Sequence, residues 1–223
     1  MSKHGIKLGI VAMEASGKTT LISKIKDALV VSTDNKAFRG KVAHFRYSHY
    51  DGLDAFIETI GEKLDLYKEK EGKYPRTLVI DSVTHLANNM EKWANDRFTG
   101  FNIWSNLSKD ILAFNAFLED DIIPAGINVV FTAHTQYDPD TAKYKIASPG
   151  SFGKNGSWLS VTDEARFIEV KSNKRVIHYR TSKFPCRTLQ DDYPDSVAIE
   201  DYDINKDIDI LENSIIESEE WTI

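Results

Sequence analysis

A segment near the start of the chain combines the residue types that hold phosphate groups. Residues 12–20 read A-M-E-A-S-G-K-T-T and match the phosphate-loop pattern G-x-x-x-x-G-K-[ST] except at the first position, where alanine replaces glycine. Gly17 lets backbone amides approach phosphate oxygens, and a helix starting at Lys18 directs its positive dipole end toward them. The residues expected to contact the nucleotide are Ala12, Met13, Glu14, Ala15, Ser16, Gly17, Lys18, Thr19 and Thr20.

Two side chains of this segment and one distant carboxylate have the chemistry for ATP with Mg2+. Lys18 should reach the β- and γ-phosphates, and the Thr19 hydroxyl should bind the metal ion. Asp81 ends the apolar run L-V-I and is expected to make a second Mg2+ contact through water. An aspartate at such a junction can also cap the following helix, a role that Ser82 could take instead.

Hydrolysis also needs a carboxylate that orients or deprotonates water. Asp34 and Glu14 are the two candidates, and Asp34 is preferred because phosphates would repel Glu14 unless its side chain turns away. His134 and Gln136 follow an apolar run and are expected to sense the γ-phosphate. Hydrogen bonding of a loop histidine to the backbone is the alternative.

The elements that must position these residues alternate between strands and helices. Apolar runs at 6–12, 78–80 and 127–133 predict buried strands, and apolar residues at helical spacing follow the first two. Residues 165–170 and 176–181 predict a β-hairpin. The pattern predicts an α/β fold with a mainly parallel sheet, helices on both faces and an antiparallel edge hairpin, and ligands at the carboxyl ends of the strands.

Composition excludes several classes of protein. In 223 residues, 41% are hydrophobic and 28% charged, which excludes a wholly disordered or fibrous chain. Cys186 is the only cysteine, so an internal disulfide and a four-thiolate zinc site are excluded. No apolar run approaches the roughly 20 residues of a membrane span and no signal peptide is evident, so we expect a cytoplasmic protein without membrane contact.

The net charge of −6 divides unevenly along the chain. Residues 190–223 hold twelve acidic residues and one lysine, giving −11, while residues 1–189 hold 27 basic and 22 acidic residues, giving +5. The basic body leaves room for a polyanionic partner.

Four segments together resemble a known family. The loop resembles the RecA-type sequence G-P-E-S-S-G-K-T, and V-I-D-S-V-T-H-L at 79–86, V-F-T-A-H-T-Q at 130–136 and S-P-G-S-F-G-K-N-G-S-W-L-S-V at 148–161 extend the likeness. The chain is similar over residues 5–189 to phage-encoded, single-domain RecA-like ATPases that promote single-strand annealing. This resemblance implies a RecA-like P-loop NTPase core at 1–189, followed by an acidic tail at 190–223.

The resemblance also implies partners. Such ATPases assemble into homo-oligomeric rings or filaments with ATP between subunits, and Lys183 is the best match to a cation that reaches the neighbouring subunit's γ-phosphate. Two departures, Ala12 and S-T-D-N-K at the place of the family's catalytic glutamate, are consistent with weak hydrolysis.

The resemblance further implies that single-stranded DNA binds to two loops, at 97–106 and 137–160. These loops carry cations for phosphates and aromatic rings for stacking on bases. The alternative is that the rings pack the loops and the lysines are ordinary surface charge. The expected DNA contacts are Arg97, Phe101, Trp104, Lys143, Lys145, Lys154 and Trp158.

Other readings of the sequence remain open. A small phosphotransferase such as a nucleotide kinase shares the phosphate loop, but would need an arginine-rich lid, and here only Arg166 lies near the end of the long insert. A nucleotide switch that loads a replication protein is a further alternative. The acidic tail is expected to compete with DNA or to offer its end, 219–223, to a partner protein. Alternatively, it covers the domain edge as a helix with Ile208, Leu211 and Ile215 on one face.

Overall fold

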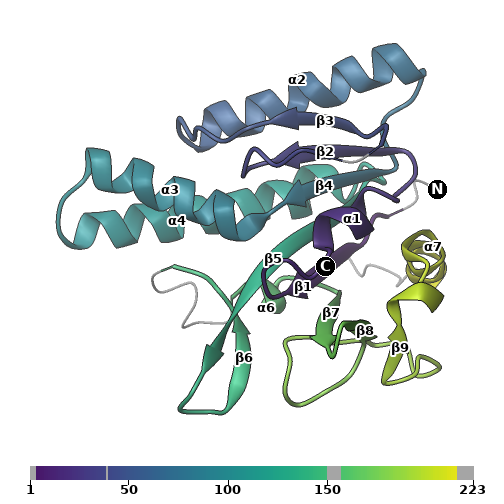
Figure 1. The fold of residues 1–223 in the computed structure, drawn as a ribbon. Coiled ribbons are helices and arrows are strands. Elements are labelled where there is room, and N and C mark those ends of the chain that lie inside the picture. The colour runs from purple at the N-terminus through teal and green to yellow at the C-terminus, as the bar shows by residue number, and fades with distance from the viewer. Residues whose placement is uncertain (1–3, 39, 150–156, 215–223) are drawn as a thin grey trace, which may run out of the picture.

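The computed structural model describes residues 4–38, 40–149 and 157–214. Strands and helices alternate along most of the chain (Figure 1). In chain order the elements are β1 (Lys7–Ala12), α1 (Lys18–Ile22), β2 (Ala28–Ser32), β3 (Ala43–Arg46), α2 (Leu53–Glu71), β4 (Thr77–Asp81), α3 (Val83–Arg97), α4 (Phe101–Phe117), the π-helical turn η1 (Leu118–Ile122), β5 (Asn128–Asp138), β6 (Lys143–Ile146), α6 (Ser157–Ser160), β7 (Glu164–Lys171), β8 (Lys174–His178), β9 (Ser196–Ala198), the 3-10 turn η2 (Ile199–Asp201) and α7 (Ile204–Ser214).

The strands form one mixed sheet in the order β3-β2-β4-β5-β1-β7-β8-β9, with β6 paired to the outer part of β5. The pairs from β3 to β7 are parallel, and β8 and β9 are antiparallel additions at one edge. This arrangement confirms the predicted fold class and the predicted edge hairpin, which is β7–β8. Because β5 separates β1 from β4, three parallel strands end side by side.

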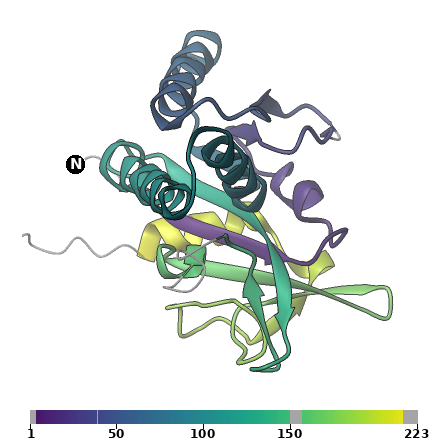
Figure 2. The same ribbon diagram turned by 90° about the vertical axis from the view of Figure 1, so that its left-hand side faces the viewer.

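Buried side chains alternate between the two faces of the sheet, as strand geometry requires. On β4, Leu78 and Ile80 pack in the core under α2, α3 and α4, whereas Val79 packs on the opposite face with α1 and α7. Figures 1 and 2 show α2, α3 and α4 on one side and α7 on the other. The strands are therefore covered on both sides, and no helix of the described residues is long and apolar enough to cross a membrane.

Two helix boundaries differ from the sequence-based expectation. The helix after the phosphate loop, α1, is only five residues long and ends at Ile22, although the apolar spacing extends to Ile25; Asp27 adopts a left-handed conformation (φ 51°) directly before β2. The first expected DNA loop, 97–106, is wrong as a loop. Residues from Phe101 onward already belong to α4, so only three residues separate α3 from α4.

The chain after residue 189 continues onto the same sheet. β9 pairs with β8, and α7 buries Ile204, Ile208 and Leu211 in the core on the α1 side. Two of these three side chains belong to the helical face considered for the tail, and Ile215 lies outside the described residues. The described part of the tail thus covers the edge of the domain, while the boundary at residue 189 stays a prediction.

A buried ion pair holds α7 in place. Arg166 on β7 is 0% exposed and donates from Nε and Nη2 to the two carboxylate oxygens of Asp207 at 2.9 and 3.0 Å. Its Nη1 donates to Glu164 at 2.7 Å, and the hydroxyls of Tyr193 and Tyr202 each donate to Asp207 at 2.6 Å. Arg166 is bonded to both carboxylates of the cluster, so it has a structural role and is not a lid residue.

Candidate functional site

The carboxyl ends of three parallel strands bring the predicted phosphate-site residues together. Ala12 at the end of β1 lies beside His134 of β5, and Asp81 at the end of β4 lies beside Thr132. Lys18 starts α1 directly above these ends. Residues far apart in sequence thus meet at one edge of the sheet, where ligands bind in open α/β folds.

The phosphate loop has the backbone conformation of a tight anion-binding turn. Ala15 and Gly17 both have left-handed φ values, 56° and 99°, and the second is far easier for glycine than for a residue with a β-carbon. Ser16 between them is 1% exposed, and among the described residues its hydroxyl has no hydrogen-bond partner. An unpaired buried hydroxyl inside a turn of amides is a group that a bound phosphate would satisfy.

Lys18 lies inside the loop, and no carboxylate of the described residues forms an ion pair with it. Its Nζ donates to the carbonyl oxygens of Ala12 at 3.1 Å and Met13 at 2.7 Å. Burial, helped by the positive charge of Lys36, lowers the pKa of Lys18 from 10.5 to about 8 against the weaker opposing effect of nearby carboxylates. A polyanion beside this ammonium would restore its ordinary pKa, so the site gains from binding one.

Thr19 and Asp81 form the pair that was predicted to hold Mg2+. The Thr19 hydroxyl donates to Asp81 at 3.0 Å, and Thr132 donates to the other oxygen of the carboxylate. Ser82 caps α3 by accepting from the amide of His85 at 3.3 Å, so Asp81 is not needed as the cap. A hydroxyl and a carboxylate are the hard oxygen ligands that Mg2+ prefers, and these residues fit the ion.

Burial raises the pKa of Asp81, and the negative charge of Asp34 adds to that increase. The hydrogen bonds from Thr132 and Thr19 oppose the shift by stabilising the charged form. A divalent cation at Asp81 would favour the same charged form, which is the expected electrostatic character of a metal-binding carboxylate.

Of the two candidate catalytic carboxylates, Asp34 lies within this cluster. Its side chain is 2% exposed, pairs with Lys36 Nζ at 2.5 Å and lies 4.0 Å from Nδ1 of His85. Glu14 is exposed and lines a small cavity of about 120 Å3 together with Lys183 and Phe184. The geometry therefore places Asp34, rather than Glu14, among the buried charges of the site.

His134 also belongs to the cluster, whereas Gln136 does not. Nδ1 of His134 lies 3.4 Å from Lys18 Nζ, and burial together with the charge of Lys18 lowers the pKa of His134 to about 4. The ring is neutral near pH 7, and its Nδ1 can accept a hydrogen bond from the Lys18 ammonium. Gln136 is exposed where β5 pairs with β6, and among the described residues no hydrogen bond joins it to the phosphate loop.

The residues predicted to bind DNA differ in their exposure and contacts. Phe101 and Trp104 are 81% and 42% exposed on α4, as a stacking role requires, and Arg97 lies over the ring of Trp93 with 4.6 Å between its guanidinium carbon and the ring centre. Lys143 is exposed, Lys145 pairs with Asp138, and Lys154 lies outside the described residues.

Trp158 is wrongly predicted as a DNA contact. It is 1% exposed and its ring lies 5.9 Å from that of Phe131, inside the core under α3 and α4. A large aromatic side chain gains more from this burial than it would gain from standing in solvent. Its glycine-rich surroundings in the sequence gave no sign of this contact.

Four further residues lie at these surfaces although the sequence assigned them no role. Lys36 and His85 surround Asp34, and Tyr137 is 53% exposed on the β5–β6 hairpin with its ring 5.3 Å from that of Tyr144. Arg175 on the β7–β8 hairpin lies against Gly17. Tyr137 and the run K-Y-K at 143–145 were the available signal for the hairpin, but the other contacts depend on tertiary structure.

A family comparison agrees with this geometry. The family model described as an AAA domain matches residues 4–183 of the chain. The chain belongs to the AAA domain family. AAA domains are nucleotide-binding ATPase domains that usually use Mg2+, so the family accounts for the phosphate loop and for the pair of Thr19 and Asp81. No curated protein matches the chain closely enough to count as a relative.

Proposed function

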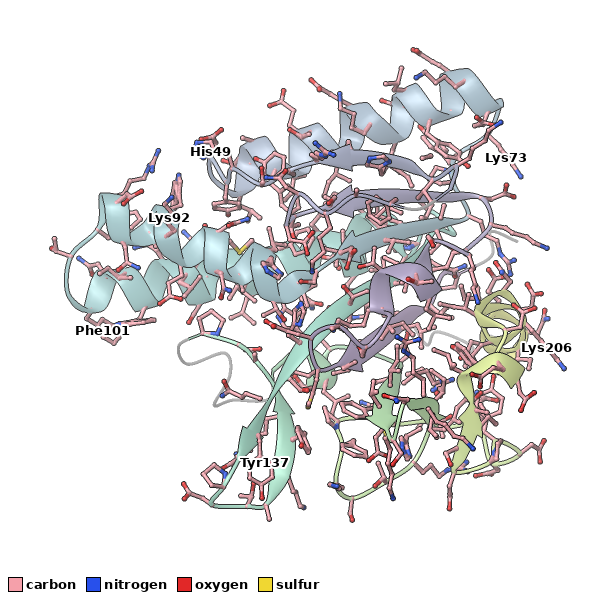
Figure 3. The ribbon with its side chains drawn as sticks, viewed as in Figure 1. His49, Lys73, Lys92, Phe101, Tyr137 and Lys206 are labelled. Atoms are coloured by element: carbon pink, nitrogen blue, oxygen red, sulfur yellow. The ribbon has the colours of Figure 1, made fainter. Side chains whose placement is uncertain are left out.

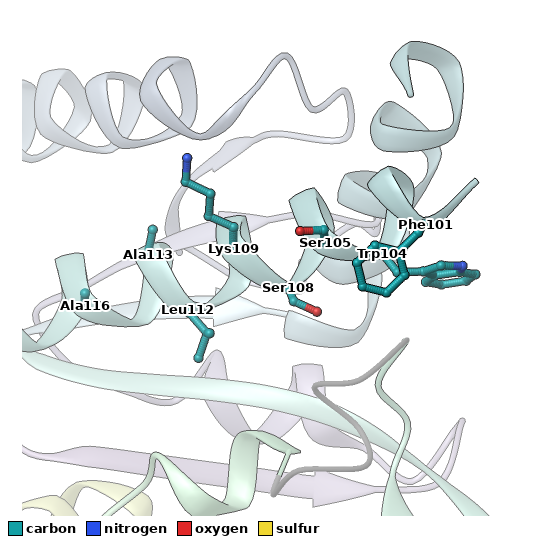
Figure 4. Close-up of a pocket in the computed structure, with 8 residues that line it drawn as sticks. All are labelled: Phe101, Trp104, Ser105, Ser108, Lys109, Leu112, Ala113 and Ala116. Carbon is teal, nitrogen blue, oxygen red and sulfur yellow. The ribbon is translucent and has the colours of Figure 1, made fainter. Parts of the chain in front are cut away.

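We propose that this AAA domain is an ATP-dependent, single-stranded-DNA-binding ATPase that promotes phage DNA recombination by single-strand annealing. The observation that carries the proposal is an exposed aromatic face at the start of α4. Phe101 and Trp104 line a surface hollow of about 730 Å3 together with Lys109 and Leu112 (Figure 4). Rings stack on any base and a lysine neutralises phosphate, so this face suits single strands without sequence preference.

The β5–β6 hairpin supplies a second surface of the same chemistry. Tyr137 is exposed on it (Figure 3). Lys143 and Lys145 lie on the facing strand. The pairing of Lys145 with Asp138 reduces the net positive charge of this hairpin. One copy therefore has only modest attraction for DNA, and an assembly that repeats both surfaces would bind a strand more tightly.

The phosphate site supports hydrolysis of the bound nucleotide. In our proposal Asp34 takes a proton from water while the water oxygen bonds to the γ-phosphorus and the bond to the ADP oxygen breaks. Lys18 stabilises the phosphate charge, and Mg2+ held by Thr19 and Asp81 would supply further charge neutralisation. Lys36 holds Asp34 in an ion pair, which agrees with weak hydrolysis in the free protein.

The proposal includes assembly into a ring or filament with ATP at the subunit interface. Lys183 is exposed, with its Nζ 5.0 Å from the centre of the Phe184 ring, so it is available to a neighbouring subunit. If Lys183 acts on the neighbour's γ-phosphate, a mixture of Lys183→Ala and Lys18→Ala proteins should recover hydrolysis that neither variant has alone. Absence of recovery in verified mixed assemblies would contradict a shared site.

The decisive experiment measures ATP turnover with single-stranded DNA, with duplex DNA and with nucleoside monophosphates. Stimulation by single strands is expected. Phosphate transfer to a monophosphate without a DNA effect would instead identify a kinase, although the insert's Arg166 is buried and paired. Nucleotide binding without turnover or DNA binding would identify a switch.

The aromatic face can be tested separately from the phosphate site. Replacing Phe101 and Trp104 together with alanine should weaken single-strand binding by about 30-fold or more, because each stacked base contributes about 1 to 3 kcal/mol and two stacks are lost. Leu112→Ala is the matched control, since Leu112 is 56% exposed on the same helix but has no ring. Equal effects of the two changes would contradict base stacking.

A further inference from the structure

The β7–β8 hairpin brings an arginine against the phosphate loop. A β-carbon placed on Gly17 would lie 3.5 Å from Nε and 3.7 Å from Cζ of Arg175, so the guanidinium is in contact range of the loop backbone. Ser172 and Asn173 form the turn of the hairpin, and both have left-handed φ values, 49° and 64°. This two-residue turn fixes the register in which Lys171 pairs with Lys174, and Arg175 follows.

Arg175 reaches this position without a carboxylate to hold it. Within residues 4–38, 40–149 and 157–214, no ion pair or hydrogen bond to its side chain is present. The acidic residue nearest to it on the hairpin, Glu169, is instead bonded to His178 at 2.9 Å. An exposed guanidinium beside a phosphate loop therefore keeps its donors available for an anionic ligand.

Lys18 and Arg175 approach different ends of the loop. Lys18 Nζ bonds to the carbonyl oxygens at the start of the loop, at Ala12 and Met13, and lies near His134. Arg175 lies at the end of the loop, at Gly17, next to the residues that begin α1. Two cations at the two ends can bind different phosphates of one nucleotide.

We propose that Arg175 binds the α- and β-phosphates of the nucleotide held by its own subunit. The inference rests on the proposed nucleotide site but not on DNA binding. A planar guanidinium with parallel N–H donors matches two phosphate oxygens, a geometry that an ammonium cannot reproduce. Because we expect the γ-phosphate on the side of Lys18 and Asp34, Arg175 should contribute equally to the binding of ATP and of ADP.

The test is titration calorimetry of ATP and ADP with the wild type and hairpin variants. Arg175→Ala should weaken both nucleotides by about tenfold, the usual effect of losing a charge-assisted hydrogen bond. Arg175→Lys should recover only part of the loss. Lys174→Ala is the matched control, because it removes the same charge from an exposed neighbouring position on the hairpin.

Each outcome decides the matter. Equal losses in Arg175→Ala and Lys174→Ala would reduce the role of Arg175 to general electrostatic attraction and overturn the proposal. A loss for ATP without a loss for ADP would overturn the assignment to the α- and β-phosphates. Arg175→Gln, which keeps a polar side chain, provides the measurement if the alanine variant does not fold.

The same experiment separates this inference from the proposed function. A wild-type protein that binds neither nucleotide would overturn the phosphate site itself. If the wild type binds, Lys18→Ala does not, and Arg175→Ala binds like the wild type, then only the role of Arg175 is wrong.

Discussion

Two buried cations on the same side of the sheet have opposite surroundings. Arg166 is 0% exposed and bonded to the carboxylates of Asp207 and Glu164, whereas Lys18 is 6% exposed and, among the described residues, has no carboxylate within ion-pair distance. Burial alone would lower the pKa of Arg166, but Asp207 and Glu164 outweigh burial and raise it. For Lys18 burial prevails and the pKa falls to about 8.

The difference separates a structural charge from a functional one. A buried charge with all partners present holds segments together and gains nothing from a ligand. A buried charge that lacks a counter-ion destabilises the free protein, and this cost is offset when an anion binds. Four experiments test this difference between Arg166 and Lys18 and its consequences for the rest of the chain.

Asp207→Ala should have the largest effect. It leaves Arg166 buried with one carboxylate instead of two and frees α7, so we expect the free energy of unfolding to fall by about 3 to 5 kcal/mol. Urea denaturation measures the change. Asp209→Ala is the control, because this side chain is 56% exposed on the same helix and bonded to Arg76 at the surface. A similar, small effect of both changes would show that the Arg166 cluster does not hold α7.

Lys18→Met should affect stability and binding in opposite directions. The free protein should be as stable as the wild type or more stable, because a disfavoured buried charge is replaced by an apolar chain of similar length. ATP affinity should fall by about 100-fold or more, the loss of about 3 kcal/mol of charge-assisted bonding. Denaturation and calorimetry on the same sample test both parts. A strongly destabilised variant would place Lys18 with Arg166 as a structural residue.

The pH dependence of that stability difference isolates the charge. The pKa of Lys18 is about 8 when folded and 10.5 when unfolded, so between these values the unfolded state binds more protons. The wild type should therefore gain stability relative to Lys18→Met as pH rises from 8 to 10.5, by up to about 3 kcal/mol, and the difference should stay constant below pH 8. A difference independent of pH throughout would show that burial does not shift this pKa.

Truncation after Ser214 should have the smallest effect. It removes Glu217, Glu219 and Glu220 and leaves α7 in place, so folding should be unchanged and single-strand DNA affinity should rise only a few-fold, at low salt. Truncation after Leu189 would also remove the partner of Arg166 and should unfold the domain. Binding across a salt series, with circular dichroism as the folding control, tests both. Unchanged affinity of the first truncation at every salt concentration would eliminate the tail as a competitor.

The sequence allowed prediction of those features that depend on residues adjacent in the chain. The phosphate loop, the strand ending at Asp81 and the capping role of Ser82 could be predicted because each depends on a strand, a turn and a helix that adjoin in sequence. Asp34 was preferred over Glu14 for its distance from the phosphates, and the structure places it among the buried charges. Its assignment as the catalytic carboxylate stays a prediction.

Contacts between distant segments were not predictable in the same way. Arg166 and Asp207 are brought together by β7 and α7, and no spacing rule connects them. Trp158 was misassigned because whether an aromatic residue in a polar segment is buried depends on the depth of the core beneath it. Helix α4 begins at Phe101 after Gly100, with no side-chain cap to mark its start in the sequence.

The length of β5 has a mechanical consequence. Its first residues pair with β1 and β4 in the parallel sheet, and its last residues pair only with β6 as a hairpin. His134 lies at the boundary between these two parts. At about 3.3 Å per residue the part of β5 beyond the parallel sheet is roughly 13 Å long, and its partner strand β6 is held to the body where the Tyr144 amide donates to the carbonyl oxygen of Lys183. A tilt of about 10° at this boundary would move the outer end of β5 by roughly 2 Å, which is enough to lengthen a hydrogen bond beyond its normal distance. If His134 contacts the γ-phosphate, as the sequence predicts, this single strand would connect the presence of that phosphate to a displacement large enough to make or lose a contact at the far surface.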